Sequence, residues 1–109
     1  MSTSNNYQLS GLLKKQAKAR QQRALSLANQ AMAMMREKGI DVRLFGSILT
    51  NDFKSHSDVD FLIISCPDEW RYTIESYIES IMLDIPFDVA YLDELPPEYK
   101  ERLNINIQG

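Results

Sequence analysis

The sequence has few of the residues that build disulfide-rich, collagen-like or membrane proteins. Its 109 residues include one cysteine, four glycines and four prolines. The single cysteine, Cys66, cannot form an internal disulfide or complete a zinc site alone, so we expect a protein of the reducing cytoplasm. No apolar run approaches the roughly 20 residues that span a bilayer, and residues 1–10 lack the apolar core of a secretory signal. We therefore expect no membrane association.

Acidic residues are absent from the first 36 positions. Residues 1–38 contain seven Lys and Arg against one acid (+6), whereas residues 39–109 contain five against fourteen (−9). Such asymmetry indicates two surfaces with different roles. We therefore predict a basic N-terminal helix over residues 1–38, with a frayed start, followed by a domain of residues 39–109. The acidic balance of that domain argues against nucleic-acid binding by the whole chain.

Helical periodicity dominates residues 8–38, and Gly39 stands where a helix-terminating glycine is expected. Two interpretations of this helix stay open. It either packs on the sheet or on a second copy of the chain, or it is a docking arm for an acidic protein or for RNA. The apolar side chains that recur at intervals of three and four are Ala24, Leu27, Ala28, Ala31, Met34 and Met35.

Three strands, a short closing strand, a stretch of helical turns and two further helices are expected after the basic helix. Within the strand expected at 58–65, residues 59–64 are nearly all apolar or β-branched, which suits a strand buried on both faces. Pro67 suits the first turn of a helix, and Pro86 places the third strand at a strand start or a sheet edge. This order predicts an α/β (α+β) fold in which helices cover a small mixed sheet. In full, we expect strands at 40–45, 58–65 and 85–92, helical turns at 48–53, helices at 67–83 and 96–103, and a closing strand at 104–107.

Three aspartates stand among apolar neighbours. The alternation of a strand points Asp58 and Asp60 to the same side, and two adjacent anions stay ionised when a cation neutralises them. Mg²⁺ prefers carboxylates together with substrate phosphates. Asp88, between Phe87 and Val89, is the candidate for a third ligand of a two-metal site. The alternatives are that the aspartate at the end of the loop, Asp58, caps a turn, that Asp60 faces solvent, and that Asp88 faces water from an edge strand.

Gly46 and Ser47 follow the first expected strand. A glycine lets the backbone approach a phosphate closely, and a serine offers its hydroxyl beside backbone N–H groups at the start of a helical turn. Taken alone, the pair is simply a turn. Ten residues separate it from Asp58, enough to return the chain to the same sheet edge. The phosphate-binding turn and the metal-binding aspartates then face one ligand, a nucleoside triphosphate with its Mg²⁺.

The combined pattern resembles the signature of the DNA polymerase β-like nucleotidyltransferases. It consists of Leu-Phe-Gly-Ser at 44–47, ten residues, Asp-Val-Asp at 58–60 and the apolar run 61–64. The small size resembles the minimal (MNT) branch of that superfamily, and the ending at 95–103 is similar to the ends of minimal members. The resemblance covers roughly residues 40–109 and implies a nucleotidyltransferase-like palm.

The resemblance also implies the site and the reaction. Asp58, Asp60 and Asp88 would be the catalytic ligands of two Mg²⁺ ions, and Gly46 and Ser47 would hold the triphosphate of ATP. AMP would pass to an acceptor hydroxyl with release of pyrophosphate. Many minimal members are antitoxins of a HEPN-type ribonuclease toxin, so the implied acceptor is a tyrosine of that partner protein.

The sequence departs from the minimal pattern after Ser47, where many members carry an arginine and this chain has Ile48. Lys54 is our candidate for the missing triphosphate-binding cation, with Arg43 as a substitute. The departure keeps alternative functions open. One is a weak or inactive palm that binds a toxin stoichiometrically, and another is an RNA nucleotidyltransferase that uses the basic helix. The sequence also leaves a homo-oligomer open.

Overall fold

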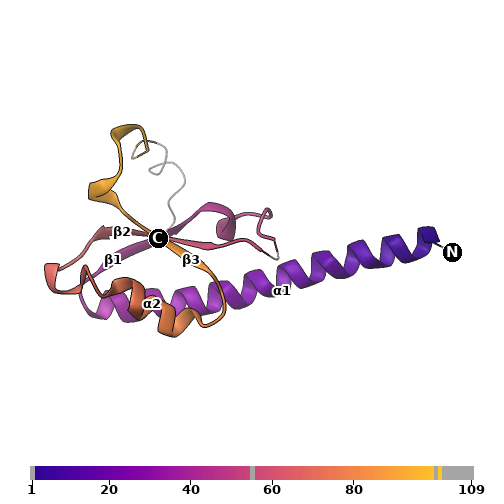
Figure 1. Ribbon diagram of the computed structural model, residues 1–109, viewed down its shortest axis with the longest axis horizontal. Helices are drawn as coiled ribbons and strands as arrows, with labels where there is room; N and C mark the ends of the chain where they lie inside the picture. Colours follow the sequence, from indigo (N-terminus) through magenta and orange to yellow (C-terminus); the bar gives the residue numbers. More distant parts are fainter. Residues whose placement is uncertain (1, 55, 100, 102–109) are drawn as a thin grey trace.

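The computed structural model describes residues 2–54, 56–99 and 101. It confirms the expected α+β fold, in which a long N-terminal helix precedes a small mixed sheet and a second helix (Figure 1). The elements are helix α1 (Ser2–Glu37), strand β1 (Asp41–Phe45), 3₁₀ helix η1 (Gly46–Leu49), strand β2 (Val59–Ser65), 3₁₀ helix η2 (Asp68–Trp70), helix α2 (Ile74–Met82), strand β3 (Phe87–Tyr91) and 3₁₀ helix η3 (Leu92–Glu94).

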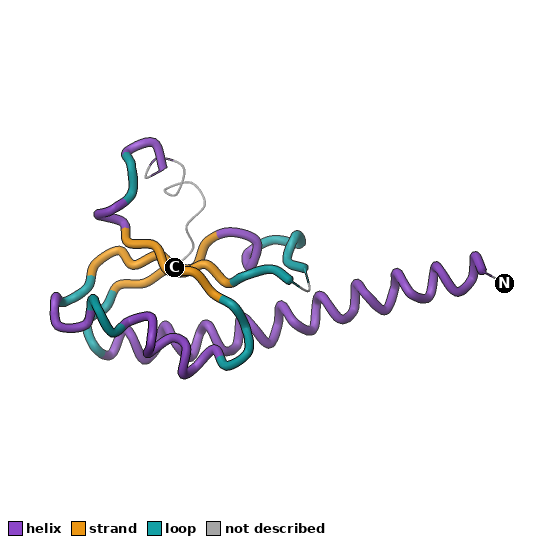
Figure 2. The backbone as a smooth tube through the Cα atoms, viewed as in Figure 1, coloured by secondary structure: helices purple, strands orange, loops and turns teal. Residues whose placement is uncertain are grey.

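The sheet has the order β1-β2-β3, with β1 antiparallel and β3 parallel to the central β2. The parallel pair requires a crossover, which η2 and α2 provide. The position of β3 at the edge confirms the prediction made from Pro86. Both α1 and α2 lie on the same side of the sheet (Figure 2), so the two faces of the sheet have different surroundings.

The hydrophobic core lies between the sheet and the two helices. Alternate residues of β1, Val42 and Leu44, point to this side and are buried. The alanines of α1 let that helix approach the sheet closely, and α2 adds larger side chains. Burying one large aliphatic side chain contributes about 1.5–3 kcal/mol to stability. Fully buried side chains in this core include Ala24, Ala28, Ala31, Met35, Val42, Val59, Phe61, Ile74, Ile78 and Met82.

Helix α1 ends where the sequence predicted. Gly39 has a φ of +82°, and its N–H donates to Arg36 O while the N–H of Ile40 donates to Met35 O, both at 3.0 Å. These two bonds form a Schellman cap, which satisfies the last carbonyls of the helix. The chain then turns directly into β1.

Helix α1 begins at Ser2, upstream of residue 8, where the helical periodicity of the sequence sets in. Gly11 does not interrupt it, since one glycine costs a helix only about 0.5–1 kcal/mol and the residues that follow are good helix formers. Figure 1 shows α1 running well past the sheet, and the molecule is 60 Å long but only 18 Å thick. Leu12 and Leu13 on this projecting part are more than half exposed.

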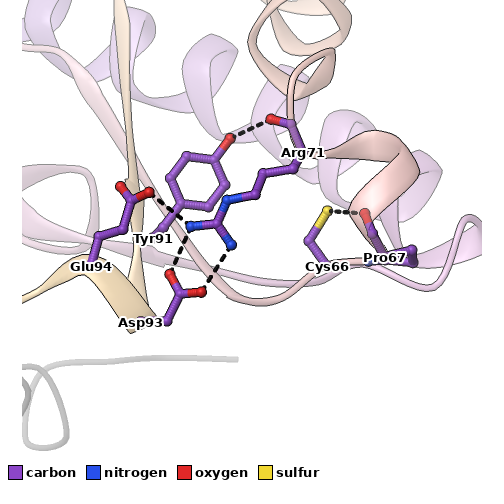
Figure 3. Close-up of polar contacts among 6 residues, drawn as sticks. All are labelled: Cys66, Pro67, Arg71, Tyr91, Asp93 and Glu94. Atoms are coloured by element: carbon purple, nitrogen blue, oxygen red, sulfur yellow. Dashed lines mark hydrogen bonds and ion pairs between the residues drawn. The ribbon is translucent and has the colours of Figure 1, made fainter.

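The single helix expected over residues 67–83 was wrong, because η2 and α2 are separate helices. Arg71 directly follows η2, and its side chain and its carbonyl oxygen both form contacts that hold this connection (Figure 3). Its guanidinium contacts the carboxylates of Asp93 and Glu94 at 2.8 Å. The carbonyl oxygen of Arg71 accepts a hydrogen bond of 3.0 Å from Tyr91 Oη. A side chain therefore binds a carbonyl that a continuous helix would use internally.

Residues 97–99 and 101 are helical, as expected for the helix after Pro96. Residues 100, 102 and 103 of that helix and the predicted closing strand at 104–107 lie outside the described residues. In the part of the chain that is described, no helix combines the length and the apolar character needed to span a membrane.

Candidate active site

The strand register brings two of the predicted carboxylates side by side. Asp60 of β2 lies opposite Asp88 of β3, and Phe45 at the end of β1 lies opposite Asp60. Because partners across a ladder point to the same face, these three residues share the face away from α1 and α2. We call it the carboxylate face. Asp58 precedes β2 by one residue, and alternation gives it the same direction as Asp60.

Gly46 is the point of closest approach between the turn after β1 and the carboxylates. Its φ is +83°, and a Cβ atom placed on it would lie 2.5 Å from Oδ2 of Asp60. Only glycine fits there without displacing the carboxylate. The Gly-Ser turn and the Asp-x-Asp segment, separated by ten residues in sequence, are therefore in direct contact.

Burial and the neighbouring aspartates disfavour the ionised form of Asp60. The pKa of Asp60 is raised to about 6, first by burial and then by the charges of Asp88 and Asp58. Burial and like charges both disfavour the ionised form of a carboxylate. A bound cation would relieve both effects. Asp60 is half-buried, whereas Asp88 is exposed.

The donor chemistry of these residues fits Mg²⁺, which binds hard carboxylate oxygens. Among residues 2–54, 56–99 and 101, however, no three His, Cys, Asp or Glu side chains are close enough together to hold a metal ion. The structure places Asp60 beside Asp88, with Asp58 within electrostatic reach. It does not gather the three carboxylates around one point.

Ser47 lies in the first turn of η1, which begins at Gly46. Its carbonyl oxygen accepts hydrogen bonds from the backbone N–H of Thr50 at 3.0 Å and from the Thr50 hydroxyl at 3.1 Å. The next side chain, Ile48, is buried in the core. The position where many minimal members carry an arginine is thus a core position in this chain.

The two candidate cations, Arg43 and Lys54, differ in their surroundings. Arg43 lies on the carboxylate face by register, but its Nε contacts Asp41 Oδ1 at 3.2 Å. Lys54 is exposed in the loop before β2, where its backbone N–H donates to Ser57 Oγ at 2.8 Å. Of the two, Lys54 has the more exposed side chain.

Sequence reasoning missed two residues of α1 that contact the loop beside the site. Gln21 and Arg20 donate hydrogen bonds to backbone carbonyls of residues 48–57. A signal was present, because both positions continue the apolar stripe that includes Ala24 and Ala28. Polar side chains on the buried stripe of a helix need partners, and here the loop provides them.

The chain is similar to a known protein family. The model of the nucleotidyltransferase domain family matches residues 28–108, which include the last turns of α1, the sheet and every predicted site residue. No curated protein and no solved structure matches the chain significantly.

Proposed function

Because the chain belongs to the nucleotidyltransferase domain family, we propose that it transfers AMP from ATP to an acceptor hydroxyl, in a Mg²⁺-dependent reaction at Asp58, Asp60 and Asp88. The family supports nucleotidyl transfer as the general activity. The observation that carries the proposal is the contact of Gly46 with the Asp60 carboxylate beside Asp88. In this proposal the phosphate-binding turn and the metal-binding aspartates act together on the carboxylate face.

The residues have distinct roles in this proposal. Gly46 lets the Gly-Ser turn approach the Asp60 carboxylate, Ser47 would offer its hydroxyl to the triphosphate, and Lys54 would add a positive charge. The three aspartates would hold Mg²⁺, which supplies positive charge at the acceptor oxygen and at the departing pyrophosphate. A bond forms between the acceptor oxygen and the α-phosphorus, the bond to pyrophosphate breaks, and the acceptor proton is released.

A tyrosine of a partner protein is the acceptor that we propose, with a HEPN-type ribonuclease toxin as the partner and this chain as its antitoxin. The proposal rests on the resemblance to the minimal branch. It is also supported by the exposure of Asp88, since the described part of the chain leaves this side of the site open. An acceptor carried on a second protein has access from that side.

A second candidate function is stoichiometric binding of the toxin by a weakly active palm. The specific observation is that Ser47 is followed by Ile48 and not by a lysine or arginine. Ile48 is buried in the core and Arg43 is paired with Asp41. Weak triphosphate binding follows if Lys54 does not supply the missing charge.

The test uses purified protein, Mg²⁺ and each α-labelled nucleoside triphosphate in turn, with an extract of the source cells as acceptor. The Asp58→Asn, Asp60→Asn double variant is compared with Asp68→Asn, Glu69→Gln, which removes two exposed acids of η2. We expect label from ATP on one protein band, lost about 10³-fold in the first variant only, as for loss of several kcal/mol of transition-state stabilisation.

Other outcomes separate the alternatives. Label in an RNA fraction would replace the protein acceptor by RNA. A folded protein that labels nothing but still neutralises a co-purified toxin would favour the binding function. Equal labelling by the wild type and the site double variant would exclude the aspartates as the reacting site.

A further inference from the structure

The connection between Ser47 and Asp58 determines how the phosphate-binding turn lies relative to the carboxylates. It spans residues 48–57, and beyond η1 its described residues form no helix or strand. Its internal hydrogen bonds are short-range, such as the reciprocal pair between Lys54 and Ser57. Bonds of this kind shape a turn but do not fix a loop against the rest of the fold.

Two consecutive residues of α1 hold this connection at its two ends. Gln21 Nε2 donates to the carbonyl oxygens of Ile48 at 3.0 Å and Thr50 at 2.7 Å. Arg20 Nη1 donates to the carbonyl oxygen of Ser57 at 2.9 Å. The first pair of bonds lies at the start of the loop, and the last bond lies at its end.

The contacted carbonyls are next to the site in sequence. Ile48 directly follows Ser47, and Ser57 directly precedes Asp58. A displacement of either carbonyl by 1 Å therefore moves a site residue by a comparable amount. Misplacement of that size is enough to slow a reaction that depends on positioning.

The middle of the loop is also held by α1. Phe53 is only 3% exposed, and the Arg20 guanidinium carbon lies 5.5 Å from the centre of its ring. The same guanidinium approaches Lys54 O at 3.4 Å. One arginine thus combines a cation–π contact with hydrogen bonds, a use for which its planar group is suited.

We propose that Gln21 and Arg20 are positioning residues that set the spacing between the Gly46-Ser47 turn and Asp58. The inference rests on the proposed nucleotidyl transfer at these residues. Consecutive residues of a helix cannot move independently, so α1 rather than the loop fixes both ends of the connection. Neither residue contacts the three aspartates in these hydrogen bonds; both act through the backbone of the loop.

The test compares Gln21→Ala with Gln22→Ala. Gln22 is the exposed neighbour on α1, and no hydrogen bond joins its side chain to the described part of the loop. We expect Gln21→Ala to lower kcat/KM for ATP about tenfold and to speed amide hydrogen exchange within residues 48–57 by a similar factor. A tenfold change equals about 1.4 kcal/mol, the size expected for one or two hydrogen bonds. Gln22→Ala should change neither quantity.

Arg20 provides a second, independent comparison. Arg20→Ala should reproduce the effects of Gln21→Ala, and Arg20→Lys should restore part of kcat/KM because lysine retains one charged donor. A purely structural role predicts a lower Tm with unchanged kcat/KM per folded molecule, and that result would overturn the inference. Unchanged exchange in residues 48–57 of Gln21→Ala would overturn it even if the wild type transferred no nucleotide. An inactive wild type with accelerated exchange in the variant would contradict the proposed function alone.

Discussion

The two faces of the sheet differ in what they contribute. The face toward α1 and α2 carries Val42, Leu44 and Phe61, which are buried in the apolar core. The carboxylate face carries Asp60 and Asp88, whose mutual repulsion opposes folding in the absence of a cation. Successive residues of the same strand thus point in turn to the apolar core and to the proposed site.

This division explains why so small a chain can hold several acids next to one another. A domain of this size has a free energy of unfolding of about 5–15 kcal/mol. The cost of placing Asp60 beside Asp88 is met by packing on the opposite face. We therefore expect substitutions on the face toward α1 and α2 to lower stability, and substitutions on the carboxylate face to lower nucleotidyl transfer.

Ile78→Ala should have the largest effect on stability and a small effect on chemistry. Ile78 is fully buried on α2, and truncation of such a side chain lowers the free energy of unfolding by about 2–5 kcal/mol. Urea denaturation measures the change, and transfer per folded molecule should stay near the wild-type rate. The half-buried Ile81 is the matched control, since Ile81→Ala should cost less.

Ile78→Val keeps the comparison testable if Ile78→Ala does not fold. It should cost about 0.5–1.5 kcal/mol. Loss of transfer in a folded Ile78→Val protein, at unchanged urea stability, would contradict the separation of the two faces.

Local patterns predicted most of the fold. The spacing of Ala24, Ala28 and Ala31 gave the buried side of α1, and Gly39 gave its end. The apolar run of β2 gave the central strand, including Leu62, which is buried although it lies on the carboxylate face. These features depend on neighbours within a few residues, which a sequence displays directly.

The remaining features depend on contacts between distant residues. The break between η2 and α2 involves the bond from Tyr91 to Arg71, which are 20 positions apart. The contacts of Arg20 and Gln21 with the loop span 27–37 positions. For the candidate site, the sequence named Asp58, Asp60 and Asp88 as ligands, but the register that sets Asp60 opposite Asp88 appears only in the structure. The binding of Mg²⁺ and ATP there stays a prediction.

Gly46→Ala tests the place where turn and carboxylates meet. The added methyl group would lie 2.5 Å from Asp60 Oδ2, and the φ of +83° is unfavourable for alanine. We expect a loss of about 2 kcal/mol in stability, of which a left-handed backbone accounts for about 1–2 kcal/mol, together with weaker ATP binding.

Gly11→Ala is the matched control. It lies in the exposed part of α1, where alanine should stabilise the helix by about 0.5–1 kcal/mol. Equal effects of the two substitutions would rule out a close approach at Gly46.

Asp60→Asn should stabilise the metal-free protein, in a manner that depends on pH. The pKa of Asp60 is raised from 3.8 to about 6 in the folded protein, so the folded state binds this proton more tightly than the unfolded state. The resulting stabilisation is complete below pH 4 and is lost as the pH rises through 6. Asparagine carries no charge and removes this dependence.

Above pH 6 the variant should be more stable than the wild type by about 1 kcal/mol, a value reduced by the screening of this half-buried carboxylate by water. The difference should vanish near pH 4, whereas the exposed Asp68→Asn should show little effect at either pH. Thermal unfolding in EDTA at pH 4 and pH 7.5 measures it, and a difference that persisted at pH 4 would show that charge on the carboxylate face is not its cause.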